Sequence, residues 1–256
     1  MRSSLLALLV ILALLSGCST DDGATCPDTP PFTISPIHPD SIQNIDPIGN
    51  LNPPGHVFPS DHGGFYIKAP TGAKQTYNVQ LFAPGDLTIV RARASHHVNA
   101  GITDFALDFE FCDNMRGVFG HVTDLDPDTF GDLADHTQWP YDGEYSTGGE
   151  IYQNRVKHMN LDVSTGARLG TTGGNPGQGG LDFGMYDRTA EAILAANPLR
   201  WSNYDYRYSF HFLDYFEEGA VKDEHLALVQ SHMLPSREAI CTGTSITMLP
   251  SNVYMF

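Results

Sequence analysis

The sequence predicts a mainly β protein with a compact antiparallel fold. Of its 256 residues, 25 are Gly and 17 are Pro, a content that favours frequent turns over long helices. The chain is 41% hydrophobic and 17% charged, which is normal for a chain that buries a core and wrong for a disordered one. Beyond residue 51, short runs that alternate apolar and polar side chains recur between turn signals. These three observations together predict an antiparallel sheet.

The strands are expected where the alternation is clearest, at residues 65–67, 77–81, 87–90 and 105–111. Turn signals such as Pro70-Thr71-Gly72 and Pro84-Gly85-Asp86 separate them. Residues 123–160 carry many Asp side chains between single apolar residues, and we expect a long acidic insertion there rather than a pair of core strands. Further elements are expected toward the C-terminus: helices at 188–196 and 221–230, and a strand within 204–216.

The charge balance excludes one class of partner. The chain has 30 acidic and 14 basic side chains, a formal net charge of -16 at pH 7. Binding to nucleic acid depends on Lys and Arg that neutralise phosphates, and too few are present for a sustained basic surface. We expect no nucleic-acid partner.

The first residues have the composition of a signal peptide. Arg2 precedes an apolar run at residues 5–15, which is shorter than the ~20 residues that span a bilayer as a helix. Leu15-Ser16-Gly17-Cys18 resembles the bacterial lipobox, which implies cleavage after residue 17 and lipid attachment at Cys18. Ser19 follows Cys18, and by lipoprotein sorting rules this suggests an outer membrane. The alternative is a plain secretory signal in which Cys18 is incidental.

Residues 18–50 are rich in Pro, Asp, Thr and Ser, and we expect them to form a tether between the lipid and a single domain at 51–256. An oxidising compartment favours a disulfide among the three remaining cysteines, Cys26, Cys112 and Cys241. We expect Cys112 to pair with Cys241, since Cys26 lies in the tether. The sequence alone does not fix this connectivity.

Four blocks resemble the lysostaphin-type zinc endopeptidase family, and they occur in the order found in that family. They are His62-Gly63-Gly64-Phe65-Tyr66-Ile67, Phe82-Ala83-Pro84-Gly85-Asp86, Val118-Phe119-Gly120-His121-Val122 and Gly179-Gly180-Leu181-Asp182-Phe183-Gly184. The resemblance covers about residues 51–187, which leaves 188–256 as a C-terminal extension. It implies a compact antiparallel β fold of the lysostaphin-like (duplicated hybrid motif) type, with a groove.

The resemblance also implies a zinc site, but the motifs are degenerate. His62 matches the first ligand, Tyr66 stands where the family has Asp, and Asp182 stands where it has the second His of His-x-His. His121 matches one catalytic His, whereas Gly180 replaces the other. A neutral phenol with a pKa near ~10 replaces a carboxylate poorly at neutral pH. The usual site is therefore damaged.

Each of these residues also has a plainer interpretation. His56 and Asp61 lie close to His62 and supply alternative ligands, or else they hydrogen-bond a Pro-rich turn. His121 either assists catalysis or is a buried structural His. Asp182, between Leu181 and Phe183, either faces the groove or is an ordinary polar residue on the exposed side of a strand. His96 and His97 are expected at the surface of a hairpin.

Two functions follow as expectations. The first is a lipid-anchored protein of the bacterial cell envelope with a degenerate metalloendopeptidase-like domain, which acts as a binding or regulatory module for peptidoglycan or an envelope protein. The second is an active zinc hydrolase of peptidoglycan peptides or proteins. It requires His62, Asp182 and a substitute ligand for the metal, with His121 as the assisting group.

Overall fold

The computed structural model describes residues 26, 30–46, 62–68, 78–175, 179–187 and 209–229. The strands in these ranges are β1 (Ile42–Asp46), β2 (Gly63–Ile67), β3 (Val79–Phe82), β4 (Leu87–His97), β5 (Ile102–Cys112), β6 (Met115–Leu125), β7 (Tyr141–Thr147), β8 (Glu150–Val163), β9 (Arg168–Thr172), β10 (Gly180–Asp187) and β11 (Ser209–Phe210). The helices are short: α1 (Pro127–Phe130), α2 (Ala220–Leu228) and the 3-10 helices Pro39–Ser41, Gly131–Ala134, His136–Gln138 and Phe212–Tyr215.

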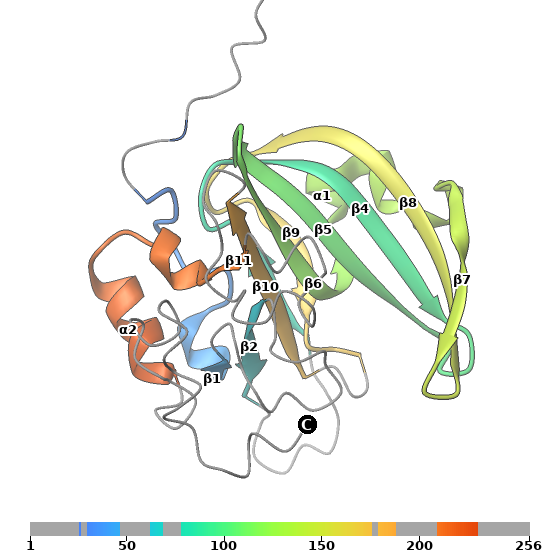
Figure 1. The fold of residues 1–256 in the computed structure, drawn as a ribbon, viewed down its shortest axis with the longest axis horizontal. Coiled ribbons are helices and arrows are strands. Elements are labelled where there is room, and N and C mark those ends of the chain that lie inside the picture. The colour runs from blue at the N-terminus through green and yellow to red at the C-terminus, as the bar shows by residue number, and fades with distance from the viewer. Residues whose placement is uncertain are drawn as a thin grey trace, which may run out of the picture.

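The predicted mainly antiparallel β fold is confirmed. The strands form one open sheet in the order β1-β2-β10-β6-β5-β4-β8-β7, and each neighbouring pair is antiparallel. Long strands β4, β5 and β8 lie side by side as a curved band, with β7 at its outer end and β1 and α2 on the opposite side of the molecule (Figure 1). Within the described ranges, no helix is long and apolar enough to cross a membrane.

The core is built around aromatic rings. Phe183, on β10, has ring centroids within 4.8–6.3 Å of five other Phe rings: Phe32, Phe65, Phe109, Phe119 and Phe212. All six side chains are fully buried. Successive side chains of a strand point to opposite faces, so the neighbours of Phe183 along β10, Asp182 and Gly184, lie on the other face of the sheet. Strand β10 thus separates the aromatic core from a polar face.

The expected tether at 18–50 is wrong for residues 30–46. Phe32, Ile37, Ile42 and Ile45 are buried in the core, and β1 pairs with β2. Phe32 also hydrogen-bonds through its backbone to Tyr215 and Glu217. This segment was predicted to be a tether because it is rich in Pro and its apolar side chains are widely spaced. In the structure those apolar side chains anchor it to the domain. The domain therefore begins well before residue 51.

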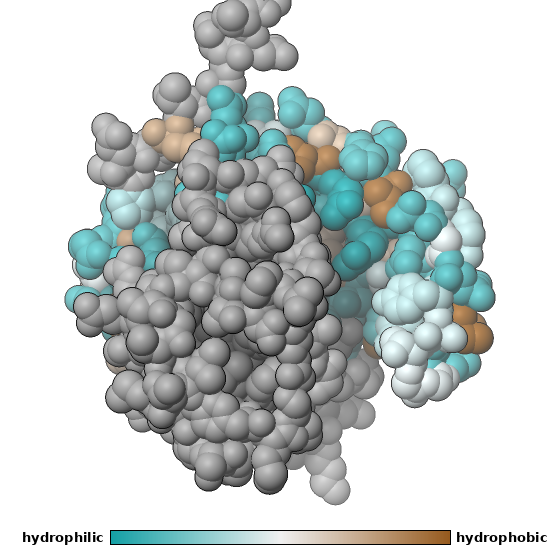
Figure 2. All heavy atoms as spheres, in the orientation of Figure 1, coloured by the Kyte–Doolittle hydropathy of each residue, from teal (hydrophilic) through white to brown (hydrophobic). Residues whose placement is uncertain are grey.

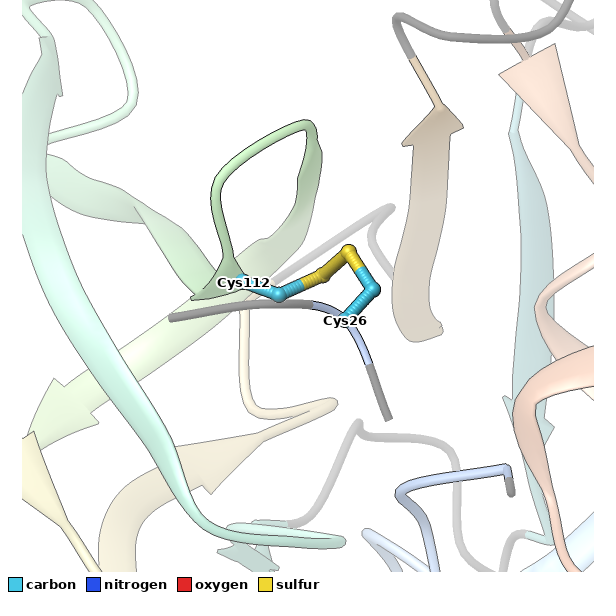
Figure 3. Close-up of a disulfide and its surroundings, with 2 residues drawn as sticks. All are labelled: Cys26 and Cys112. Atoms are coloured by element: carbon cyan, nitrogen blue, oxygen red, sulfur yellow. A yellow bond between two sulfur atoms is a disulfide. The ribbon is translucent and has the colours of Figure 1, made fainter. Parts of the chain in front are cut away.

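The disulfide also differs from the expectation. Cys26 is bonded to Cys112 at the end of β5, with a Cα–Cα separation of 4.9 Å (Figure 3). The expected pairing of Cys112 with Cys241 is therefore wrong, and Cys241 lies outside the described residues. The reason is the packing just described. Because Phe32 is held in the core, the chain six residues before it passes the β5–β6 turn.

The region expected as an excursion, 123–160, contributes to the sheet. Strand β8 pairs with β4 along most of its length, from Leu87–Val163 to His97–Tyr152. Alternation did not reveal it because most of its side chains are polar and only partly buried. Helix α2 confirms the element expected at 221–230. Of the range 204–216, the structure describes residues 209–216, which form β11 and a 3-10 helix. The helix expected at 188–196 lies outside the described residues.

Candidate functional site

Three neighbouring strands, and the residue just before a fourth, each contribute one group to a chain of alternating His and Asp side chains on the polar face. His62 precedes β2, Asp182 is on β10, His121 is on β6 and Asp104 is on β5. Oδ2 of Asp182 lies 3.3 Å from Nε2 of His62 and 3.2 Å from Nε2 of His121. Nδ1 of His121 lies 3.1 Å from Oδ2 of Asp104. We call these four residues the His–Asp chain.

A β-bulge turns His121 toward this chain. The register runs from Leu107–Phe119 to Phe105–Val122, so Gly120 and His121 on β6 together oppose the single residue Ala106 on β5. His121 has a φ of 58°, and no other non-glycine residue in the described ranges has a positive φ. Without the bulge, strand alternation would put His121 on the same face as the buried Phe119. The bulge brings it to the polar face instead.

A left-handed conformation at a residue with a Cβ costs about 1–2 kcal/mol, so the surrounding structure must hold it. Thr172 on β9 does so: its Oγ1 lies 2.7 Å from the backbone oxygen of His121 and 3.1 Å from that of Gly180. Thr172 is fully buried. Strained residues held in this way are concentrated at functional sites. The bulge is therefore the structural feature that singles out His121.

The two ring nitrogens of His121 both face carboxylate oxygens, and both act as donors only when the ring carries two protons. Burial by itself would lower the pKa of His121, but the hydrogen bond to Asp104 and the charges of Asp182 and Asp104 outweigh it, and the net pKa is raised. The site therefore favours the charged imidazolium. An imidazolium has no nitrogen lone pair to offer a metal ion.

The residues present do not fit the three-ligand zinc site that the resemblance implies. The phenol of Tyr66 hydrogen-bonds Asp46, and burial, Asp46 and the charge of Asp182 all raise its pKa, so it stays neutral. Gly180 pairs with Tyr66, and a Cβ at Gly180 would lie 2.4 Å from the backbone oxygen of Phe65. This backbone therefore excludes the His that the family has there. Among the described residues, no group of three or more His, Cys, Asp or Glu is arranged to hold a metal ion.

The structure brings together three of the residues selected from the sequence, His62, Asp182 and His121. Asp182 faces the polar side of β10, as the alternation with Leu181 and Phe183 indicates. The substitute ligands His56 and Asp61 and the lipidation residue Cys18 lie outside the described residues. The expectation for His97 is wrong, because it is buried against the ring of Tyr152.

Asp104 is the site residue that sequence reasoning missed. It follows Thr103 at the start of an alternating strand, where an outward-facing Asp is unremarkable. Its contact with His121 depends on the bulge in β6, for which the sequence carries no clear signal. Gly120, directly before His121, is the nearest hint, because glycine is common at bulges.

Comparison with known proteins adds no relative: no family model, no curated protein and no solved structure matches this chain.

Proposed function

We propose that this protein is a lipid-anchored, outer-membrane component of the bacterial cell envelope whose lysostaphin-like β domain binds a cell-wall or envelope ligand on its polar face without hydrolysing it. The His–Asp chain is the centre of that binding surface. In this proposal Cys18 carries the lipid, and the tether runs from Cys18 to Cys26, which is bonded to Cys112.

The observation that carries this proposal is the placement of Asp182. Its Oδ2 atom lies between the two imidazoles, 3.2 Å from Nε2 of His121 and 3.3 Å from Nε2 of His62, within ion-pair distance of both. The groups that would bind a cation therefore satisfy one another, and Tyr66 is engaged by Asp46. What the face offers a ligand is a set of fixed, partly exposed charged donors and acceptors. Such a set is suited to recognition.

The test is co-sedimentation of the soluble domain with purified peptidoglycan sacculi, with and without a chelator, together with analysis of released products. We expect binding that the chelator leaves unchanged, no released peptide, and weaker binding by Asp182→Asn. The control is Asp108→Asn, which removes a carboxylate that pairs with Arg91 on the same sheet but outside the His–Asp chain. Chelator-sensitive release of wall peptides would contradict the proposal.

The second candidate is an active zinc-dependent endopeptidase, and one observation favours it. Two ligands of a tetrahedral zinc ion with bonds of ~2.0–2.1 Å are about 3.3 Å apart. Both imidazole Nε2 atoms lie at about that separation from Asp182, at 3.2 and 3.3 Å. This candidate needs deprotonation of His121, or a third ligand from elsewhere in the chain. Zinc content decides between the two.

A further inference from the structure

At the outer end of the sheet, a stack of rings stands on β4, β8 and β7. The rings of Tyr152 and Tyr145 are stacked, with centroids 4.7 Å apart and an interplanar angle of 4°. His97 meets Tyr152 edge to face, at 4.5 Å and 62°, and supports the stack from its inner side. Tyr145 lies on β7, the last strand of the sheet order. His97 is buried and Tyr145 is 50% exposed, so the stack is fixed at its inner end and open at its outer end.

The ring stack shares a face with the His–Asp chain. Asp104 pairs with Ser95, and Ser95 pairs with Asn154, so these three side chains lie on one face. His97 is two residues from Ser95 along β4, and Tyr152 is two residues from Asn154 along β8. The ring stack therefore lies on that same face, in the next row of side chains. Ser95 donates a hydrogen bond to Asn154, so polar groups continue from Asp104 toward the stack. Three strand spacings of ~4.8 Å separate β5 from β7, about 14 Å. A ligand of several units reaches from one to the other.

We propose that Tyr145 is the stacking platform for a sugar ring of an uncharged glycan chain. The apolar face of a pyranose carries C–H bonds with partial positive charge, and these pack on the negative face of an aromatic ring. Tyr152 and His97 hold the platform rigid, which lowers the entropy that binding costs. The proposal rests on the proposed function, because it assigns a ligand class to the same face.

The negative charge of the protein indicates which class of glycan this surface can bind. The chain has a formal charge of -16, and the surface over β4, β8 and β7 is mainly hydrophilic in Figure 2. Glu150 on β8 pairs with Thr147, so by the same alternation it lies on the face that carries Tyr145 and Tyr152. Uronate or phosphate groups would be repelled there. A neutral, N-acetylated or unmodified polysaccharide is the matching occupant.

An extended peptide pairing with the edge of β7 is the competing occupant, and the geometry disfavours it. The pairing of β7 with β8 shifts register between Tyr141 and Gly143, and Gly143 has a φ of 115°. Such irregularities, together with charged side chains, are the features by which edge strands resist pairing. The exposed ring is therefore a better docking feature than the exposed backbone.

The test is isothermal titration calorimetry of the soluble domain with the neutral β-1,4-linked tetramer of N-acetylglucosamine. We expect Tyr145→Ala and Tyr145→Val to bind about ten-fold more weakly, and Tyr145→Phe to stay within about three-fold of the wild type. Val keeps a good strand former at this position, so a loss in both variants is not a folding effect. The matched control is Tyr141→Ala. Tyr141 is also on β7 and is 58% exposed, but it pairs with Arg155 on the opposite face.

Three results would overturn the inference: no binding of the tetramer at millimolar concentration, equal losses in the Tyr141 and Tyr145 variants, or preferential binding of an alternating Lys-Val hexapeptide. Asp182→Asn separates this inference from the proposed function. If that variant binds the tetramer and the sacculi as the wild type does, the ring stack stands and the role of the His–Asp chain fails. If only sacculus binding falls, both stand.

Discussion

The two faces of strand β10 are built on opposite principles. On the core face, Phe183 packs among five other Phe rings, so its position is held by many contacts. On the polar face, Asp182 is held by two imidazoles, and one of these is present only because β6 contains a bulge. Each side chain on the core face is held by many contacts at once, whereas each side chain on the polar face depends on one or two partners. Stability should therefore depend on one face and ligand binding on the other.

The same contrast separates two histidines. His225 on α2 is fully buried against the rings of Phe65 and Phe216, and burial lowers its pKa to about 4. His121 lies between two carboxylates, which raise its pKa. Burial thus disfavours protonation of the imidazole on the core side, whereas two carboxylates favour it on the polar face.

The largest expected difference between the two faces is in the stability lost when one side chain is replaced on each side of β10. Phe183→Ala should lower the free energy of unfolding by about 3–5 kcal/mol, because it leaves a cavity among rings that cannot all collapse inward. Asp182→Asn should cost at most about 1 kcal/mol, because its partners are partly exposed. Urea unfolding followed by circular dichroism measures both. Equal losses would show that the polar face is as important for stability as the core.

Acid should destabilise the fold through His225. Its folded pKa of about 4 lies below the ordinary histidine value of 6.5, so the unfolded chain binds the extra proton between those values. The free energy of unfolding should therefore fall by about 1.4 kcal/mol per pH unit as the pH drops through this window. Unfolding from pH 7 to 4 measures the slope, and His225→Gln, which keeps a donor for Ser35, should flatten it. An unchanged slope in that variant would contradict the assignment.

Backbone strain at the bulge should have a smaller effect on the free energy of unfolding. With its φ of 58°, His121 occupies a conformation that glycine adopts without cost. His121→Gly should therefore be about 1 kcal/mol more stable than His121→Ala, although both lose the His–Asp chain. Thermal unfolding of the two variants makes the comparison. If the Ala variant were as stable as the Gly variant, residue 121 would not be strained.

The smallest effect is on the titration of His121. Asp104→Asn removes the charge facing Nδ1, so the pKa of His121 should fall, and the NMR titration of its ring protons should shift to lower pH. Because the folded pKa is raised, the stability it contributes is present below pH 6.5 and lost as pH rises through the folded pKa. Asp108→Asn, also on β5, is the control. If Asp104→Asn left the titration of His121 unchanged, Asp104 would not be part of the site.

The sequence predicted what alternation encodes, namely the antiparallel class, the outward face of Asp182 and the approximate positions of β2 to β5. It did not predict β8, whose polar side chains hide a strand that pairs with β4. Nor did it predict that Phe32 belongs to the core, because isolated apolar residues in a Pro-rich segment resemble a linker. Asp104 was missed because its contact depends on a bulge, which is a property of two paired strands rather than of either one.

We propose above that the side chains of the His–Asp chain pair with one another and hold no metal ion. The most direct measurement is the zinc content of the soluble wild-type domain and of the Tyr66→Asp/Asp182→His double variant, which restores the ligand types of the lysostaphin-type family. Both are loaded with zinc, dialysed and analysed by elemental mass spectrometry. We predict almost no zinc in the wild type and close to one equivalent in the double variant. One equivalent of zinc in the wild type, lost in His62→Ala, would contradict the claim.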